Sequence, residues 1–218
     1  MRTRTKWQLG ILAVLVVAIA VAIGLTAQQK SIDTAPESTA PSEPALAADS
    51  HLLSEGSTDA TFVEFLDFEC PSCRQMAPVV EDLRAKHGDQ VTFAMRYFPL
   101  PGHKNSMTSA LAAEAAAQQG KFTEMADKLF ETQPEWGGKQ DSQADFFRGL
   151  AKELGLDLAE YDAAVADPAT TERIESDKQA GEELGVQGTP TFFLNDTLVE
   201  LETLEELQEA VAEAAQGS

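Results

Sequence analysis

A buried strand that leads straight into a cysteine pair limits what this chain can fold into more than any other feature. Residues 61–68, TFVEFLDF, are β-branched and aromatic with few breaks, which is typical of a central strand covered on both faces. The motif C-P-S-C follows at residues 70–73, and apolar residues then recur at helical spacing up to about residue 86. Residues 91–98 have the composition of a second strand. Strand, helix and strand in this order predict a βαβ unit.

The rest of the chain predicts several helices and then a strand pair with a closing helix. Glycine and proline residues separate helical patterns at 107–119, 122–131, 143–154, 158–165 and 170–184. Residues 191–194 predict a strand, Asn195-Asp196 a tight turn, 198–201 the partner strand, and 204–215 a final helix. The expected class is therefore α/β, with the order βαβ…ββα and a helical insertion at about 104–184.

The N-terminal region predicts a membrane-spanning segment. The 23 residues between Lys6 and Lys30 carry no charge, and three basic residues precede them. A helix of this length crosses a hydrocarbon core of roughly 30 Å. By the positive-inside rule, residues 1–6 stay in the cytoplasm and the rest of the chain is exported. The expected domains are 1–6 cytoplasmic, 7–27 signal-anchor helix, 28–49 disordered linker and 50–218 folded domain.

A cleaved signal peptide is the alternative interpretation of the same segment. The apolar run from Leu9 to Leu25 is longer than the usual signal-peptide core, and only a poor cleavage site follows it. We therefore expect a single-pass anchor in the cell membrane, and either interpretation exports the folded domain. Residues 28–49 are rich in Pro, Ser, Thr and acidic residues, which is typical of a disordered tether.

Composition excludes several classes of protein. The chain has 36 acidic and 16 basic side chains, a net charge of −20, which argues against a nucleic-acid partner. A hydrophobic content of 43% permits a real core. Two cysteines are too few for a disulfide-stapled miniprotein.

Three interpretations compete for the C-x-x-C pair. A structural zinc site needs four ligands, and the three histidines, His51, His87 and His103, lack metal-ligand spacing, so no metal is expected. A structural disulfide across so short a loop constrains little unfolded-state entropy. A redox dithiol fits a cysteine that opens a helix after a buried strand, because the helix N-terminus stabilises a thiolate. The redox interpretation is favoured, with the reversible disulfide itself as the only redox group and no cofactor.

The position of each residue in the motif predicts its role. Cys70 lies at the helix N-terminus with its sulfur exposed to the free amides, so we expect it to be the attacking, low-pKa thiol. Cys73 lies one turn later and is shielded, so it should resolve the mixed disulfide. Pro71 fixes the first helical turn. Ser72 supplies no positive charge, which predicts intermediate oxidising power.

Glu64 is a further candidate, because it places an acid in the otherwise apolar row formed by alternate strand residues. A buried carboxyl with a raised pKa can exchange a proton with Cys73 during each transfer. An acid at a strand edge that reaches water is the other interpretation, and both remain open at this point.

Thr189 and Pro190 form a second candidate part of the site. A proline at the first residue of a strand can have a purely structural role, because it ends the hydrogen-bond ladder there. However, X-Pro is where cis peptide bonds occur, and a cis Thr189–Pro190 bond would leave the Thr189 backbone free to pair with an extended substrate.

These residues together resemble a known family. FLDFECPSC, RYFPLPGH, an Ala-rich helix followed by QGKF, and LGVQGTPTFFLN occur in the order seen in DsbA-like thiol:disulfide oxidoreductases of the thioredoxin superfamily, especially membrane-anchored forms of Gram-positive bacteria. The resemblance implies a thioredoxin fold split by a helical insertion, with Cys70 as nucleophile, Cys73 as resolving thiol, Pro190 as cis-proline and Glu64 as buried acid.

The resemblance also implies partners and marks departures. Such proteins oxidise cysteine pairs of exported polypeptides, and a membrane quinone-linked thiol oxidase reoxidises them. Thr123 and Ala126 stand where an aromatic residue and a His are expected, and Asp196 replaces a Gly. His103 is interpreted as structural or as a surface residue.

An extracytoplasmic dithiol oxidase is thus the first functional hypothesis. A reductase or isomerase that receives electrons through the membrane, for example in cytochrome maturation, has the same active-site residues, and the reduction potential distinguishes the two. A thioredoxin-like binding module or chaperone is the third hypothesis, which the intact cysteine pair disfavours.

Overall fold

The computed structural model describes residues 44–200 and 203–217. The expected cytoplasmic residues, the anchor helix at 7–27 and most of the expected linker lie outside this part. Within the described residues, no helix is long and apolar enough to cross a membrane.

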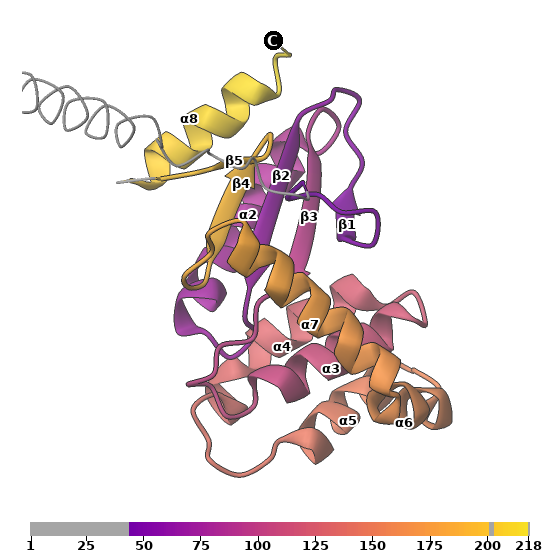
Figure 1. The fold of residues 1–218 in the computed structure, drawn as a ribbon. Coiled ribbons are helices and arrows are strands. Elements are labelled where there is room, and N and C mark those ends of the chain that lie inside the picture. The colour runs from indigo at the N-terminus through magenta and orange to yellow at the C-terminus, as the bar shows by residue number, and fades with distance from the viewer. Residues whose placement is uncertain (1–43, 201–202, 218) are drawn as a thin grey trace, which may run out of the picture. The chain divides into compact units, whose positions relative to one another are not determined.

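A mixed five-stranded sheet forms the centre of the domain (Figure 1). The strand order is β1-β3-β2-β4-β5. Its members are β1 (His51–Ser54), β2 (Thr61–Leu66), β3 (Thr92–Tyr97), β4 (Thr191–Leu194) and β5 (Thr197–Leu198). Only the β2–β3 pair is parallel, and the other pairs are antiparallel. Strand β2 therefore lies in the middle of the sheet, as its apolar composition predicts.

The predicted βαβ unit is confirmed. Helix α2 (Pro71–His87) connects β2 to β3, and Gly88 follows its last turn. Pro71 occupies the first turn, where its missing N–H costs no helical hydrogen bond. Strands β2 and β3 pair in parallel from Thr61 with Thr92 onward. The cysteine pair comes soon after β2 in the chain, so it lies at the carboxyl end of this central strand.

The helical insertion packs against this same end of the sheet. It contains α3 (Ser106–Ala117), α4 (Phe122–Trp136), α5 (Ala144–Glu153), α6 (Leu158–Ala166) and α7 (Pro168–Glu183). One apolar cluster joins Leu66, Phe68 and both cysteines to buried residues of α3–α6, such as Met125 and Trp136. The carboxyl end of β2 is thereby removed from water.

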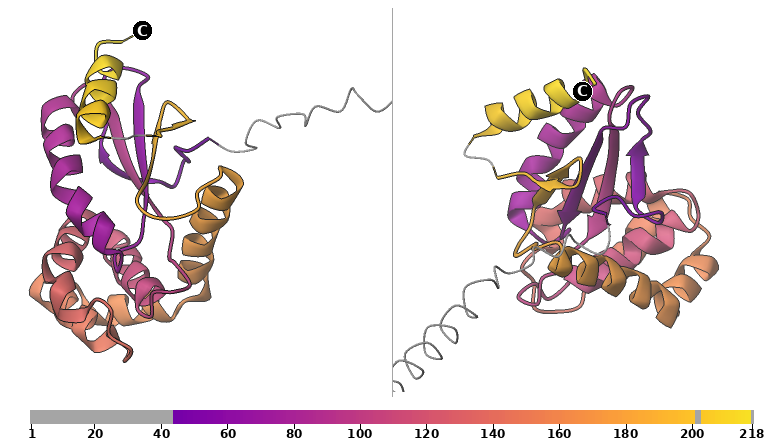
Figure 2. Two further views of the ribbon diagram at one scale, coloured as in Figure 1. Left: turned by 90° about the vertical axis from the view of Figure 1, so that its left-hand side faces the viewer. Right: turned by 45° about the horizontal axis from the view of Figure 1, so that its top comes forward.

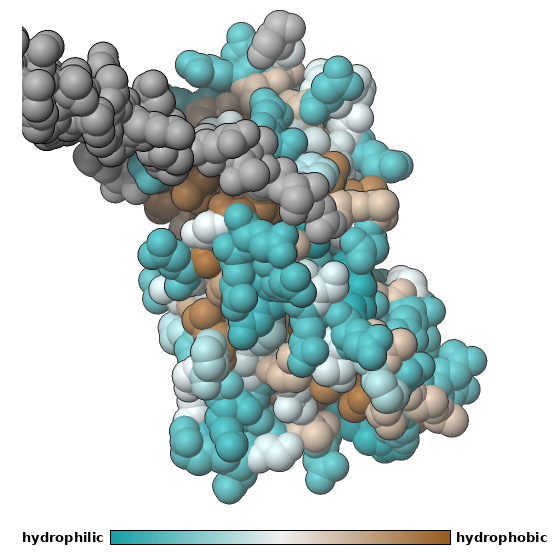
Figure 3. Space-filling view, in the orientation of Figure 1, coloured by the Kyte–Doolittle hydropathy of each residue, from teal (hydrophilic) through white to brown (hydrophobic). Residues whose placement is uncertain are grey.

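Helices cover both faces of the sheet (Figure 2). On one face, α2 and α8 (Leu204–Ala214) pack on Phe62, Phe93 and Phe192 through Leu83 and Leu207, among others. Helix α7 lies on the opposite face, where Val63, Phe65, Ala94, Phe98 and Phe193 form the core. The face shown in Figure 3 is mainly hydrophilic, with apolar atoms gathered chiefly over the sheet, in keeping with the high net charge.

A buried ion pair fixes α7 to the sheet. Arg96 of β3 donates from Nε to Asp177 of α7 at 2.6 Å, and the two side chains are 1% and 0% exposed. Asp177 also accepts the backbone N–H of Tyr97 at 3.1 Å. Arg173 of α7 also pairs with Asp177 at 2.6 Å. Removal of Asp177 would therefore leave the buried charge of Arg96 without its acidic partner, so this contact fixes how α7 docks.

The structure differs from the sequence prediction at four places. Strand β1 was not predicted, and β5 is shorter than the expected 198–201. Helix α4 continues through Pro134 to Trp136, because the buried Trp136 side chain offsets the hydrogen bond that proline removes. The packed chain also begins before residue 50, because Ala45 is fully buried and its carbonyl accepts from Arg96.

Gly181 of α7 marks a close approach between helix and sheet, and its replacement tests this packing. A Cβ atom there would lie 2.8 Å from Phe98 Cδ2 and 3.0 Å from Phe65 Cδ1. We expect Gly181→Ala to lower the free energy of unfolding by about 1–3 kcal/mol through overpacking. Urea denaturation followed by circular dichroism measures this.

Gly149 of α5 supplies the matched control, since no atom lies within 4 Å of its Cβ position. Gly149→Ala should raise the free energy of unfolding by up to about 1 kcal/mol, from helix propensity alone. Equal effects of the two substitutions would contradict the proposed overpacking.

Candidate active site

Cys70 and Cys73 lie at the start of helix α2, on the central strand's carboxyl side. Cys70 is the N-cap residue, with extended backbone angles of φ −70° and ψ 121°. Cys73 lies one turn into the helix and is fully buried, whereas Cys70 is 6% exposed. Both thiols are free. Cys70 is therefore more covered than expected from the sequence, but it remains the more accessible of the two sulfurs.

The surroundings of Cys70 favour its thiolate. The hydrogen bond from the Cys73 thiol lowers the pKa of Cys70 to about 5, against burial, which acts in the opposite direction. Thr189 and the backbone amides of Cys73 and Ser72 also contribute to this lowered pKa. The helix-start amides thus contribute as the sequence predicts, but the neighbouring thiol contributes more.

The surroundings of Cys73 favour its protonated form. Burial raises the pKa of Cys73 far above that of a free thiol, and the hydrogen bond to Cys70 and the nearby Glu64 carboxyl raise it further. The two sulfurs are therefore electrostatically distinct. Cys70 carries the negative charge of the reduced pair, and Cys73 carries the proton.

Glu64 lies beneath this pair on strand β2. It is 2% exposed and stands between Met95 of β3 and Phe192 of β4 in the sheet. Its Oε1 atom has no hydrogen-bond partner among the residues that the structure describes. Burial, with a smaller contribution from the Cys70 charge, raises the pKa of Glu64 to about 8. The interpretation of Glu64 as an edge acid that reaches water is wrong, because β2 is a central, buried strand.

The structure brings the Thr189-Pro190 segment to the cysteine pair. The Thr189–Pro190 peptide bond is cis. The Cys70 thiol donates to the Thr189 carbonyl at 3.3 Å, across 119 residues of sequence. Pro71 and Ser72 are exposed beside it. Cys73, Ser72 and Thr189 thus lie next to the Cys70 sulfur, Pro71 and Pro190 adjoin them in the chain, and Glu64 lies near Cys73.

Buried carboxylates hold the loop that leads to Cys70, which the sequence analysis missed. Asp67 accepts hydrogen bonds from the Glu69 and Leu100 backbone amides at 2.8 and 3.0 Å. His103 approaches the same carboxylate with Nδ1 at 2.6 Å. His103 is thus a structural residue, as expected. The only signal in the sequence was the pair of acids that flanks Phe68 immediately before the motif.

Gln133 of helix α4 is a second neighbour of the loop before Cys70 that the sequence did not indicate. Its Nε2 donates to the carbonyls of Phe68 and Cys70, at 2.7 and 3.0 Å. The side chain is buried, with the residue 6% exposed. No local pattern in the sequence distinguishes this glutamine from the exposed ones.

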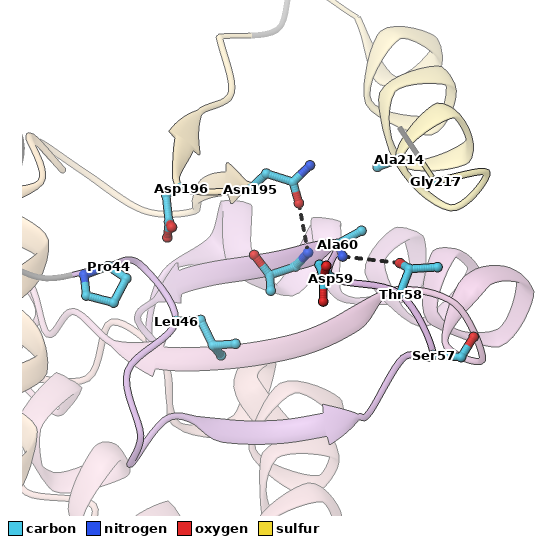
Figure 4. Close-up of a pocket in the computed structure, with 11 residues that line it drawn as sticks. Pro44, Leu46, Ser57, Thr58, Asp59, Ala60, Asn195, Asp196, Ala214 and Gly217 are labelled. Atoms are coloured by element: carbon cyan, nitrogen blue, oxygen red, sulfur yellow. Dashed lines mark hydrogen bonds between the residues drawn. The ribbon is translucent and has the colours of Figure 1, made fainter.

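Two hollows in the surface lie at different distances from the cysteines. A cavity of about 680 Å³ lies where β2 begins, bordered by Thr58, Asp59, Asn195 and Asp196 (Figure 4). Thr61 and Asn195 are hydrogen-bonded there, so this cavity is at the end of β2 remote from Cys70. A groove of about 400 Å³ lies beside Pro190 instead. Within the described ranges, no cluster of three or more His, Cys, Asp or Glu side chains could hold a metal ion.

A thiolate-forming cysteine at a helix start, its buried partner and a neighbouring cis-proline define a thiol–disulfide exchange site. The thioredoxin family model Thioredoxin_4 matches residues 48–213. The chain belongs to the thioredoxin family, and solved structures of DsbA proteins share its fold.

Solved structures agree with this assignment. A thioredoxin-like oxidoreductase from Silicibacter pomeroyi DSS-3 is 30% identical, covers 79% of this chain and 95% of its own, and has a TM-score of 0.66. BdbD from Bacillus subtilis shares the fold at 24% identity and a TM-score of 0.66, over 77% of this chain and 94% of its own. Wolbachia pipientis alpha-DsbA1 shares it at 19% identity and a TM-score of 0.67, over 78% and 93%.

The curated relatives that match are longer proteins. The protein named Na(+)/H(+) antiporter NhaA 1 of Mycobacterium sp. (strain KMS) is 35% identical over 150 residues, which are 66% of this chain and 23% of that protein. NhaA 3 of Salinispora tropica is 39% identical over 146 residues, 66% of this chain and 21% of that protein. The chain therefore spans less than a quarter of the length of these relatives.

The low pKa of Cys70 predicts fast alkylation at neutral pH. A thiol with a pKa of about 5 is almost fully ionised at pH 7, whereas a free cysteine with a pKa of ~8.5 is only about 3% thiolate. The rate of reaction of the reduced protein with iodoacetamide should be flat from pH 8 to 6 and fall to half near pH 5. Cys70→Ser should abolish this phase, and a midpoint near pH 8.5 would contradict the assignment.

The raised pKa of Glu64 predicts a pH-dependent cost to folding. The folded carboxyl binds its proton more tightly than the unfolded one, so the cost is absent below about pH 4 and grows until the pH passes the folded value of about 8. Relative to the parent protein, reduced Glu64→Gln should gain about 4 kcal/mol of stability between pH 4 and 8. Urea denaturation at successive pH values measures this, and a constant difference would show that Glu64 does not titrate there.

Proposed function

We propose that this protein is an extracytoplasmic dithiol oxidase, which introduces disulfide bonds into exported polypeptides. The observation that carries the proposal is the separation of charge between the two thiols, with the Cys70 pKa lowered to about 5 and that of Cys73 raised. A stabilised thiolate makes the reduced form more stable than in an ordinary dithiol. Stabilisation of the reduced form makes the disulfide a better oxidant.

The proposed reaction proceeds through a mixed disulfide. A substrate thiolate attacks Cys70 Sγ of the Cys70–Cys73 disulfide, a substrate–Cys70 bond forms, and Cys73 leaves with the electron pair. Protonated Glu64 lies close enough to influence Cys73 and supplies the proton that this buried sulfur needs. A second substrate thiolate then attacks the substrate sulfur, and Cys70 leaves as a stabilised thiolate. The substrate has lost two electrons, and the enzyme dithiol has gained them.

Surface features beside Pro190 support polypeptide substrates. The groove there is lined by Met76, Phe192, Leu198 and Leu204, among others. Leu198 and Leu204 are 38% and 46% exposed, so the groove offers apolar side chains to solvent. An unfolded polypeptide can place apolar side chains in such a groove while its backbone lies along Thr189 and Pro190.

The N-terminal sequence supports a location at the outer face of the cell membrane. The uncharged segment at 7–27 and its basic N-side are the basis for a single-pass anchor with the catalytic domain outside. A membrane quinone-linked thiol oxidase is the proposed reoxidant, and the Cys70–Cys73 disulfide is the only redox group that the proposal requires.

Oxidative refolding tests this function directly. The oxidised protein should restore activity to a reduced, unfolded disulfide protein such as ribonuclease. Its potential against glutathione should lie between those of DsbA and thioredoxin, about −120 and −270 mV, and nearer the former. A potential at or below that of thioredoxin, with no refolding, would favour a membrane-fed reductase or isomerase instead.

Substrate trapping provides the matched pair of variants. With substrates that carry disulfide bonds, the Cys70 thiolate of Cys73→Ser should displace one substrate sulfur and accumulate mixed disulfides, because the Cys73 thiol that would release them is missing, while Cys70→Ser should accumulate none. Non-reducing gels with mass spectrometry identify the linked cysteine. Equal trapping by both variants would overturn the roles assigned to the two thiols.

A further inference from the structure

The helical insertion holds each of the three residues that precede helix α2. Gln133 binds the carbonyls of Phe68 and Cys70. Glu69, which lies between them, accepts from the Asn105 backbone amide at 2.6 Å and from the Gly138 backbone amide at 2.9 Å. All of these donors lie 36 to 69 residues away in the sequence, within or at the start of the insertion. The loop that carries the reactive cysteine is therefore held by the insertion rather than by the sheet alone.

Gln133 is the contact in this set that reaches the reactive residue itself. Two acceptors face its amide, and a carbonyl oxygen can only accept, so the NH₂ end must point toward Phe68 and Cys70. Both of its N–H groups are thus used. The Cys70 carbonyl also accepts the first helical hydrogen bond, from the Arg74 N–H at 3.2 Å. Gln133 consequently fixes the peptide group at which the loop turns into helix α2.

The position of this peptide group determines where the Cys70 sulfur lies. The sulfur must stay near the Cys73 thiol and the backbone amides of Ser72 and Cys73 for the thiolate to receive its hydrogen bonds. The N–H groups of Gln133 also place partial positive charge next to Cys70 in a buried environment, where such charge acts strongly. Both effects stabilise the negatively charged, reduced form more than the uncharged disulfide.

We propose that Gln133 is a positioning residue through which the helical insertion sets the reduction potential of the Cys70–Cys73 pair. The inference rests on the thiol–disulfide exchange activity of this site and adds a residue that touches neither sulfur. It assigns the insertion a role in the redox chemistry in addition to covering the carboxyl end of β2.

Gln133→Met tests this role, because methionine has a similar length and no N–H group. The measurement is the equilibrium in which the protein disulfide and two glutathione thiols give the protein dithiol and glutathione disulfide. We expect the equilibrium constant to fall about three- to tenfold, which corresponds to ~15–30 mV for two electrons. The acid dissociation constant of the Cys70 thiol should fall by a comparable factor, so the midpoint of its alkylation should move to higher pH.

Gln118→Met is the matched control. Gln118 is another glutamine of the insertion, and its Nε2 donates to Thr170 Oγ1 at 3.2 Å, away from the cysteines. This variant should lose stability without a change in the glutathione equilibrium. An unchanged equilibrium in folded Gln133→Met, or an equal shift in Gln118→Met, would overturn the proposal.

A second variant keeps the test decisive if Gln133→Met does not fold. Gln133→Asn retains the amide but is one methylene too short to reach both carbonyls, so its equilibrium constant should fall in the same direction. An unchanged constant in this variant would also overturn the proposal. The equilibrium is measured on the protein itself, so a parent protein that exchanges with glutathione but refolds no substrate would refute the oxidase proposal and leave the Gln133 test intact.

Discussion

Desolvation at the carboxyl end of strand β2 is the constraint on which the rest of this active site depends. Cys73 is fully buried and Glu64 nearly so, and neither can ionise easily there. The negative charge of the reduced pair is therefore confined to Cys70, the sulfur that remains closest to solvent. Without this burial Cys73 would ionise more easily, and the two thiols would differ less in their roles as nucleophile and proton carrier.

The burial in turn requires the helical insertion. The sheet and helix α2 alone would leave Phe68 and the cysteines at an open edge, but residues of α3–α6 cover them in one apolar cluster. The same cover buries polar groups of the loop before α2, which need hydrogen-bond partners. Residues of the insertion supply these hydrogen bonds. Packing and hydrogen bonding thus come from the same elements. This explains why a domain with a simple central sheet devotes four helices of the described chain, α3–α6, to that end.

Several parts of the fold and site followed from local patterns. The apolar strand, the cysteine motif and the helix after it are contiguous, so their periodicity and order were sufficient to predict the β2–α2–β3 unit. Strand β1 was missed because HLLS is short and has little alternation, and it is a strand only through its pairing with β3. Helix α4 passes Pro134 because tertiary burial of Trp136 outweighs a local preference.

The sequence alone determined the identity of the reactive pair and the helix on which it lies, because both are encoded by neighbouring residues. Pro190 was named as the cis-proline from the family resemblance, and the fold brought its segment to Cys70. Only the tertiary structure decided that Glu64 is buried and that its Oε1 has no hydrogen-bond partner among the described residues, since one strand's residues cannot show whether that strand is central or at an edge. Only the tertiary structure, likewise, brought Gln133 to Cys70. Hydrogen bonds that satisfy buried carbonyls across more than sixty residues leave no periodic signal in the sequence, because their geometry exists only after the chain has folded.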